Sequence, residues 1–329
     1  MKAGSVRLGH FEIQTETAED TTRALYTNGR HQCKLVVLIA KNVADESGNW
    51  QFAALTAAER NSLTVTQYAT NPDAPLPTGW HCDTDKDKYD PGLWPPRGSE
   101  TYSTTLSSSP AKPSIASGPL EMVERYMRVN AGQPIQSYRF MARIQIAGKV
   151  YTTNYTDDDA SFNSWVEIQP ERPYVLRVAQ LVRYIDNRAF EDKARNIYID
   201  VHYWTPPRGL KFIQNIGIAN PLNIKDEGRF FNTSDFISVP NDKSGILVER
   251  DSLEERVFMA DVQQGIYSGN GPDIEYRRCF KVMRALKLHG GVPSTPHRDT
   301  GHWSLLDNFG CEHKFRLKLG GTPSLELTD

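Results

Sequence analysis

The sequence predicts a mostly β protein made of antiparallel β-sandwich-like domains, immunoglobulin-like or jelly-roll-like, with one or two short helices. Apolar and polar residues alternate over short stretches, which is the pattern of half-buried strands. Clusters of Gly, Pro, Asn, Asp and Ser separate these stretches and indicate turns. Residues 35–39 are apolar at every position, which is typical of a central strand covered on both faces.

Residues 138–204 carry the clearest strand pattern. Phe140, Ala142 and Ile144 fall on one face, and Gly148 permits a tight reversal because it lacks a Cβ. Five strands are expected here, at residues 138–146, 150–155, 162–168, 174–184 and 196–204. We expect them to form one contiguous antiparallel sheet whose core contains Phe140, Ile144, Val166, Val178 and Ile199.

The composition along the chain predicts four regions. Residues 1–30 are polar and threonine-rich and are interpreted as an N-terminal arm or an edge strand. Residues 31–102 are expected to form a small β-sandwich-like domain. Residues 103–118 hold an excess of Ser, Thr and Pro, which is typical of a linker. Residues 119–329 are expected to form a larger antiparallel β domain.

Helices are expected to be few and short. Thr56 and Glu59 have the spacing of a capping box, in which each side chain accepts a hydrogen bond from the other residue's backbone N–H. A second signature of this kind begins residues 252–264, where the pattern favours a helix although a strand also fits. Residues 188–195 are expected to form one or two helical turns.

The charge balance bears on which partners are expected. There are 38 Lys and Arg against 40 Asp and Glu, giving a formal net charge of −2, and the pI is about 6.5. A net charge this close to zero produces no long-range electrostatic attraction for the nucleic-acid backbone, so nucleic-acid binding is not expected. No apolar run is long enough for a transmembrane segment, and the first residues lack the apolar core of a signal peptide. We therefore expect the chain to be cytoplasmic at synthesis, with export by a signal-independent route left open.

Aromatic residues gather in turn-rich sequence at positions 80–102. Rigid aromatic side chains on loops are frequent binding surfaces for proteins and carbohydrates. The alternative is a loop that folds over the end of a sheet and uses its rings as anchors. The candidate binding residues are Trp80, Tyr89, Trp94 and Tyr102.

A group of zinc-ligand residue types lies near the C-terminus. Imidazole and thiolate are ligands that Zn²⁺ prefers, and four of them in tetrahedral geometry close a structural site. The candidate ligands are His297, His302, Cys311 and His313. Their spacing matches no standard zinc finger, so the alternative of ordinary loop residues with one partly buried Cys is favoured, and no other cofactor is expected.

Two acidic segments resemble cation sites only in part. Residues 83–87 place Asp at the first, third and fifth positions of a calcium-loop pattern, but Lys88 and Trp94 occupy the positions that need a Gly and a carboxylate. Residues 157–159 are three consecutive Asp in a turn, for which a solvated turn is the favoured interpretation.

The four cysteines are scattered and form no CxxC pair. They are Cys33, Cys82, Cys279 and Cys311. Reduced thiols are expected, although a bridge between Cys33 and Cys82 stays open if their strands face each other.

The sequence contains no nucleophile elbow, no HExxH and no phosphate-binding or dinucleotide-binding glycine motif. We therefore predict a non-catalytic structural or recognition protein that self-assembles or binds another macromolecule. The expected partners are the chain itself, another protein or a carbohydrate. The alternatives are a toxin delivered without a signal peptide, as a β-type pore former, and a hydrolase without a recognisable motif.

Overall fold

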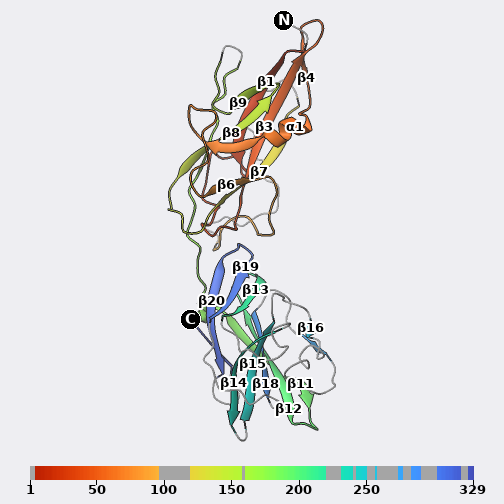
Figure 1. Cartoon of the computed structure of the whole chain (residues 1–329), viewed down its shortest axis with the longest axis vertical. Coiled ribbons are helices and arrows are strands. Elements are labelled where there is room, and N and C mark those ends of the chain that lie inside the picture. The colour runs from red at the N-terminus through yellow and green to blue at the C-terminus, as the bar shows by residue number, and fades with distance from the viewer. Residues whose placement is uncertain are drawn as a thin grey trace. The chain divides into compact units, whose positions relative to one another are not determined.

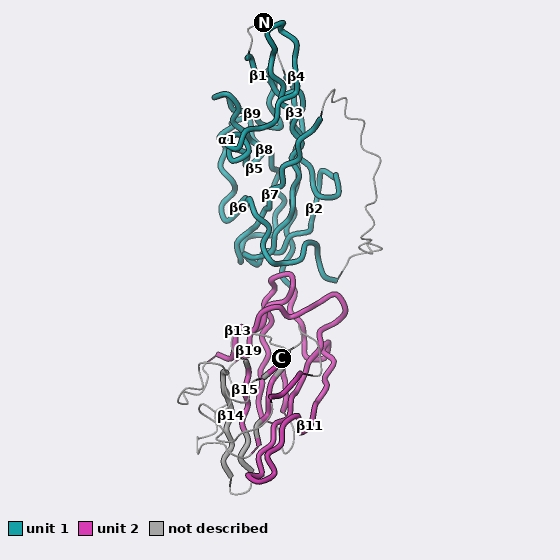
Figure 2. Tube along the Cα trace, turned by 90° about the vertical axis from the view of Figure 1, so that its right-hand side faces the viewer, with its two compact units in different colours: residues 1–173 teal, residues 174–329 magenta. Residues whose placement is uncertain are grey.

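The computed structural model describes residues 4–95, 119–157, 160–219, 231–239, 242–249, 256–257, 273–276, 283–289, 302–319 and 325–329. The chain is mostly β, with several antiparallel sheets, which confirms the predicted fold class. It divides into two compact units, Met1–Pro173 and Tyr174–Asp329 (Figure 2).

The first sheet of unit 1 has the strand order β1-β3-β7-β6, with β4 also paired to β3. Its strands are β1 (Val6–Thr15), β3 (Cys33–Ala44), β4 (Trp50–Phe52), β6 (Trp80–Asp83) and β7 (Glu121–Val129). The apolar run predicted as a central strand lies in β3, which pairs on both sides, with β1 and with β7 (Figure 1).

The second sheet of unit 1 has the order β2-β10-β8-β5, with β9 paired to β8. Its strands are β2 (Thr21–Thr22), β5 (Thr64–Gln67), β8 (Tyr138–Ile146), β9 (Lys149–Thr152) and β10 (Val166–Ile168). The predicted hairpin is confirmed: Ile146 pairs with Lys149, and Ala147 and Gly148 form the turn at φ of 49° and 83°. Positive φ at both turn positions matches the twist of the strands, and Gly148 adopts it without a Cβ clash.

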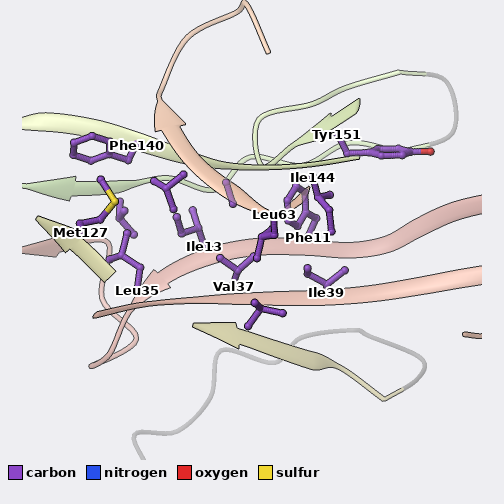
Figure 3. Packing of buried hydrophobic residues seen from close by; sticks show 14 of the residues in the cluster. Phe11, Ile13, Leu35, Val37, Ile39, Leu63, Met127, Phe140, Ile144 and Tyr151 are labelled. Carbon is purple, nitrogen blue, oxygen red and sulfur yellow. The ribbon is translucent and has the colours of Figure 1, made fainter. Parts of the chain in front are cut away.

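The core of unit 1 lies between these two sheets (Figure 3). Alternation in each strand sends one set of side chains inward, where they are buried. The first sheet contributes Phe11, Ile13, Leu35, Val37 and Met127. The second sheet contributes Phe140, Ile144 and Val166, together with Leu63, which directly precedes β5. Unit 1 is therefore a β-sandwich.

A short helix, α1 (Ala57–Ser62), packs beside this sandwich, and the predicted capping box of Thr56 and Glu59 is present at its start. The guanidinium of buried Arg125 on β7 reaches the end of α1. It donates to the backbone oxygen of Leu63 from Nε at 3.0 Å and from Nη2 at 2.9 Å, and to that of Arg60 at 2.8 Å. Arg125 thus ties the first sheet to the segment that leads into the second.

Arg125→Ala is expected to lower the free energy of unfolding of unit 1 by about 2–3 kcal/mol, because charged hydrogen bonds are lost and the carbonyl of buried Leu63 loses both of its bonds from the guanidinium. Urea denaturation read by hydrogen exchange of unit 1 peptides measures the loss. Arg23→Ala is the control, because Arg23 is half exposed and pairs with Glu171 at the surface. Equal stability of the two variants would refute the assigned role of Arg125.

Unit 2 is also built from two principal sheets. The first has the order β11-β12-β18-β15-β14 and contains β11 (Val182–Asp192), β12 (Ile197–Thr205), β14 (Phe231–Val239), β15 (Asp242–Glu249) and β18 (Met283–His289). The second has the order β13-β19-β20-β21 and contains β13 (Phe212–Ile218), β19 (His302–Asp307), β20 (Glu312–Leu319) and β21 (Leu325–Thr328). Trp204 of β12 meets Trp303 of β19 edge-on at 6.2 Å, so the two sheets pack face to face.

Unit 2 also contains a separate two-stranded pair, β16 (Arg256–Val257) with β17 (Ile274–Glu275), and one 3-10 turn, η1 (Val178–Gln180). The strand β16 lies inside residues 252–264, for which a helix was favoured. Its two residues pair as a strand, and the rest of that segment lies outside the described residues. Residues 188–195, expected to turn helically, instead complete β11 and a turn into β12.

The domain boundaries differ from those predicted. Residues 103–118 lie outside the described residues, but β6 and β7 on either side of them pair with each other, so both flanks belong to unit 1. Residues 1–30 are not a separate arm: the edge-strand alternative holds, because β1 lies at the edge of the first sheet, pairs with β3 and buries Phe11 in the core. The division falls instead after Pro173.

The expectation of one sheet over residues 138–204 is also corrected. The strands β8, β9 and β10 lie in unit 1, whereas β11 and β12 lie in unit 2. Of the five predicted core residues, Phe140, Ile144, Val166 and Ile199 are fully buried. The fifth, Val178, is only partly buried because it lies in η1 rather than in a strand.

Cys33 and Cys82 do not face each other. Both lie opposite Met127 of β7, one on each side. Two strand spacings, about 9–10 Å, therefore separate them, which is too far for a disulfide. Both are free thiols, and burial raises the pKa of Cys33 to about 12.

Candidate binding groove in unit 1

The loop that follows β6 is held against the body of unit 1 by two buried side chains. Nδ1 of His31 accepts from the backbone N–H of Tyr26 at 3.0 Å, so its Nε2 carries the proton and donates to the backbone oxygen of Asp90 at 3.0 Å. The hydroxyl of Tyr26 donates to the backbone oxygen of Trp94 at 2.8 Å and accepts from its N–H at 2.7 Å. These bonds fix the loop without using the side chains of Asp90 or Trp94.

A turn at Asn28 and Gly29 places the residues that face this loop. Gly29 has φ of 78°, and Oδ1 of Asn28 accepts from the backbone N–H groups of Arg30 and His31 at 2.9 and 2.8 Å. The strong turn signal read from the sequence is therefore realised. The turn sets His31 inward, and Gln32 follows it at the edge of the loop.

Gln32 and Arg128 organise the base of the loop. The amide nitrogen of Gln32 donates to Oδ2 of Asp83 at 2.9 Å, and its oxygen accepts from the backbone N–H of Asp87 at 2.8 Å. Nε of Arg128 donates to Oδ2 of Asp83 at 3.0 Å. Burial raises the pKa of Asp83, but the bonds from Arg128 and Gln32 outweigh burial and leave that pKa below its usual value.

A hollow of about 750 Å³ opens between this loop and the first sheet. It is lined by Gly29, Arg30, Gln32, Cys82, residues 83–87 and Arg128. A second hollow of about 260 Å³ is lined by Glu16, Lys34, Tyr89, Pro91, Glu124 and Tyr126 together with Gln32 and Lys86. Because both hollows include Gln32 and Lys86, they adjoin. We call the two together the loop groove.

The charges of the smaller hollow are arranged in pairs. Nζ of Lys34 lies 2.6 Å from Glu16 and 3.3 Å from Glu124, and the hydrogen bond to Glu16 is the main reason that the pKa of Lys34 is raised. The hydroxyl of Tyr126 donates to Glu124 at 2.6 Å, which with the nearby Lys34 lowers the pKa of Glu124. Burial and this bond raise the pKa of Tyr126 to about 12. At neutral pH the hollow therefore presents fixed ion pairs and a phenol that keeps its proton.

The predicted binding aromatics occupy different environments. Trp80 is a core residue, 5% exposed, with its ring centroid 4.8 Å from that of Phe140. Tyr89 is 7% exposed and contributes to the wall of the smaller hollow. Trp94 is partly buried and anchors the loop through its backbone, and Tyr102 lies outside the described residues. The loop that carries these aromatics borders both hollows, and most of the side chains that line the hollows are polar.

The predicted zinc ligands are not brought together. His297 lies outside the described residues. In the regular β19–β20 ladder His302 lies opposite Arg316 and His313 lies opposite Leu305, so the two His side chains point to opposite faces of the sheet. His302 is exposed, whereas Cys311 and His313 are fully buried.

Both ring nitrogens of His313 are also engaged by the protein. Nδ1 accepts from the backbone N–H of Leu176 at 3.1 Å, and Nε2 lies 3.0 Å from Oδ2 of Asp307. In the part of the chain that the structure describes, no group of three or more His, Cys, Asp or Glu is placed to hold a metal ion.

The acidic segments are likewise engaged in protein contacts. Asp83 is bound by Arg128 and Gln32. Asp157 lies 2.7 Å from Nζ of Lys149 and accepts from the backbone N–H of Ala160 at 2.8 Å, while residues 158–159 lie outside the described residues. Among the helices that are described, none is long and apolar enough to span a membrane.

Known proteins resemble this chain only weakly. No protein-family model matches the chain, and no curated protein matches it significantly. The C-terminal domain of the Streptococcus pyogenes antigen I/II-family protein AspA aligns at 9% identity over 99% of both chains, with a TM-score of 0.24. A structure named BspA_C_mut aligns at 9% identity over 97% of both chains, with a TM-score of 0.22. At TM-scores this low the likeness carries no argument about the fold or the function of this chain.

Proposed function

We propose that this chain is a non-catalytic recognition protein that binds another macromolecule, a protein or a carbohydrate, through the loop groove. The observation that carries the proposal is a loop held by buried bonds to His31 and Tyr26, which leaves polar side chains around an open hollow of about 750 Å³. A volume of this size is in the range of ligand sites.

The fixed loop favours recognition over a purely structural role. A binding surface that is ordered before the ligand arrives loses less conformational entropy on binding. Gln32 holds Asp83 and Asp87 at once, and Arg128 holds Asp83 from the other side, so the geometry of the polar groups is set in advance. Surface loops positioned by a rigid sheet are also the common location of binding residues.

Lys86→Glu is expected to weaken binding of a groove ligand about tenfold or more, because Lys86 lines both hollows and the substitution replaces a charged hydrogen-bond donor with a carboxylate that only accepts. Immobilised full-length chain is screened against an oligosaccharide array, a displayed peptide library and the chain itself. Each ligand found is then titrated against both proteins.

Lys314→Glu is the matched control for this experiment. Lys314 is exposed in unit 2, lies 3.3 Å from the carboxylate of Glu312 and lines neither hollow, so the same change of charge is made outside the groove lining. If every ligand binds Lys86→Glu and Lys314→Glu equally, the groove is not the binding site and the proposal fails.

A further inference from the structure

We infer that the loop groove selects neutral oligosaccharides over anionic polymers and over peptides. The inference rests on the proposed function and names the ligand class of the same site. It follows from the charge balance of the groove, from the polarity of its lining and from the groups that the fixed loop presents.

The groove carries almost no net charge. Its cations are Arg30, Lys34, Lys86 and Arg128, and its anions are Glu16, Asp83, Asp85, Asp87 and Glu124. Arg128 is paired with Asp83, and Lys34 is paired with Glu16 and Glu124. A sulfated, sialylated or phosphate-bearing polymer gains its affinity from a surplus of cations, and here five carboxylates outnumber four cations.

The larger hollow is also too polar for a peptide anchor. Eight of its ten lining residues have polar or charged side chains, and the other two are Gly29 and Cys82. Peptide recognition draws most of its affinity from apolar or aromatic anchors that fill dry pockets. A ligand that is itself covered with hydroxyl groups suits this lining because it can exchange its water hydrogen bonds for protein ones.

The groups at the base of the hollow match hydroxyl pairs. Carboxylates present several acceptor sites each, and a hydroxyl both donates and accepts. Asp83 and Asp85 can accept from sugar hydroxyls, while Arg30 and Lys86 can donate to them. Pro91, which is exposed, adds a small apolar surface in the adjoining hollow beside the buried Tyr89, and the C–H face of a sugar ring can pack on it.

The test is a glycan array that holds neutral, sialylated and sulfated oligosaccharides, probed with the full chain, followed by calorimetric titration of the neutral oligosaccharide that gives the strongest signal. Asp85→Ala is expected to weaken that ligand about tenfold, because a charged hydrogen-bond acceptor is lost. Asp73→Ala is the control, since Asp73 is an exposed carboxylate that pairs with Arg143 away from the groove. Affinity should also change less than about twofold when salt is raised about tenfold, because ionic contacts are screened and neutral ones are not.

The outcomes separate this inference from the proposed function. Binding of neutral glycans that is weakened by Asp85→Ala but not by Asp73→Ala supports both. Groove-dependent binding of peptides or of anionic glycans alone, with a steep salt dependence, overturns the inference and leaves the proposed function standing. No binding of any neutral glycan, or binding that Asp85→Ala leaves unchanged, also overturns the inference.

Discussion

Asp307→Ala is expected to lower the free energy of unfolding of unit 2 by about 3–5 kcal/mol, the range seen when one partner of a buried charged network is removed. The Asp307 side chain is fully buried. Oδ1 accepts from the backbone N–H groups of Phe309 and Cys311, each at 2.9 Å. Oδ2 accepts from the hydroxyl of Tyr174 and lies 3.0 Å from Nε2 of His313.

The network around Asp307 fastens the start of unit 2 to the turn between β19 and β20. His313 extends it, because Nδ1 accepts from the backbone N–H of Leu176. Without the carboxylate, three buried donors and the partly buried Tyr174 hydroxyl lose their acceptor, and the residues that lead in from Pro173 lose their tie to the sheet. The network accounts for the burial of His313, both of whose ring nitrogens it engages, and it binds the backbone N–H of Cys311.

Hydrogen exchange read by mass spectrometry distinguishes the two units and measures this loss. Peptides of β19 and β20 should exchange faster in Asp307→Ala, while peptides of β3 and β8 should be unchanged. Glu312→Ala, at a partly exposed carboxylate paired with Lys314, is the control. A loss below about 0.5 kcal/mol at Asp307, the size of a surface effect, would show that the network is not what holds this region.

Local patterns predicted some strands closely, such as 138–146 and 196–204, whereas the strand predicted at 174–184 begins only at Val182. The alternation in 138–146 identified Phe140 and Ile144 as core residues, and both are fully buried. The capping box at Thr56 and Glu59 was readable because it needs only two residues at fixed spacing, and it is present. Structural features that depend only on residues close together in the sequence can therefore be predicted from the sequence.

Pairing over long sequence separations was not predictable in this way. The strand β7 lies between β3 and β6 although more than 70 residues separate β7 from β3 in the chain. The Ser, Thr and Pro excess at 103–118 has the composition of a domain linker, but a long connection between adjacent strands of one sheet has the same composition. Composition alone does not distinguish these two cases.

The candidate site was likewise predictable only where it depends on neighbouring residues in the sequence. The sequence indicated the loop of residues 80–94 through its aromatics, but Trp80 turned out to be a core residue. Gln32 and Arg128 were missed because they are ordinary polar residues at or next to strands, and only the fold brings them to Asp83. His302 and His313 do not converge as the zinc alternative requires, because a strand alternates faces and places these two side chains on opposite sides of the sheet.

Acidification is expected to destabilise unit 2 through His202 on β12. This side chain is fully buried, and among the described residues no group forms a hydrogen bond with its Nε2. Its Nδ1 lies 3.5 Å from Nη2 of Arg183 on β11. Burial, together with the positive charge of Arg183, lowers the pKa of His202 from 6.5 to about 3.

The sign of the effect follows from proton binding in the two states. Above pH 6.5, His202 is neutral in both the folded and the unfolded chain and contributes nothing. Between pH 6.5 and about 3, the unfolded chain binds a proton that the folded chain does not, so stability falls as the pH falls. The slope is about 1.4 kcal/mol per pH unit, or roughly 5 kcal/mol over the whole window.

The neighbouring groups explain why the folded state resists this proton. Asp200 lies on the same strand and is bound to His289 of β18 at 3.0 Å, so its negative charge is already engaged. Lys287 of β18 lies directly opposite Asp200 in the ladder and is also buried. A protonated His202 would therefore add a cation beside Arg183 and Lys287 within the sandwich.

His202→Gln is expected to remove this slope, because glutamine is polar and of similar size but does not titrate. Denaturation of the full chain at a series of pH values from 7 to 4, read by hydrogen exchange of β12 peptides, measures the slope in each variant. His302→Gln is the control, because His302 is exposed on the surface of the same unit and should leave the slope unchanged. At pH 4 the His202→Gln variant should have lost roughly 3 kcal/mol less stability, relative to its own value at pH 7, than the wild type. Equal slopes in His202→Gln and the wild type would show that other groups carry the acid sensitivity of unit 2.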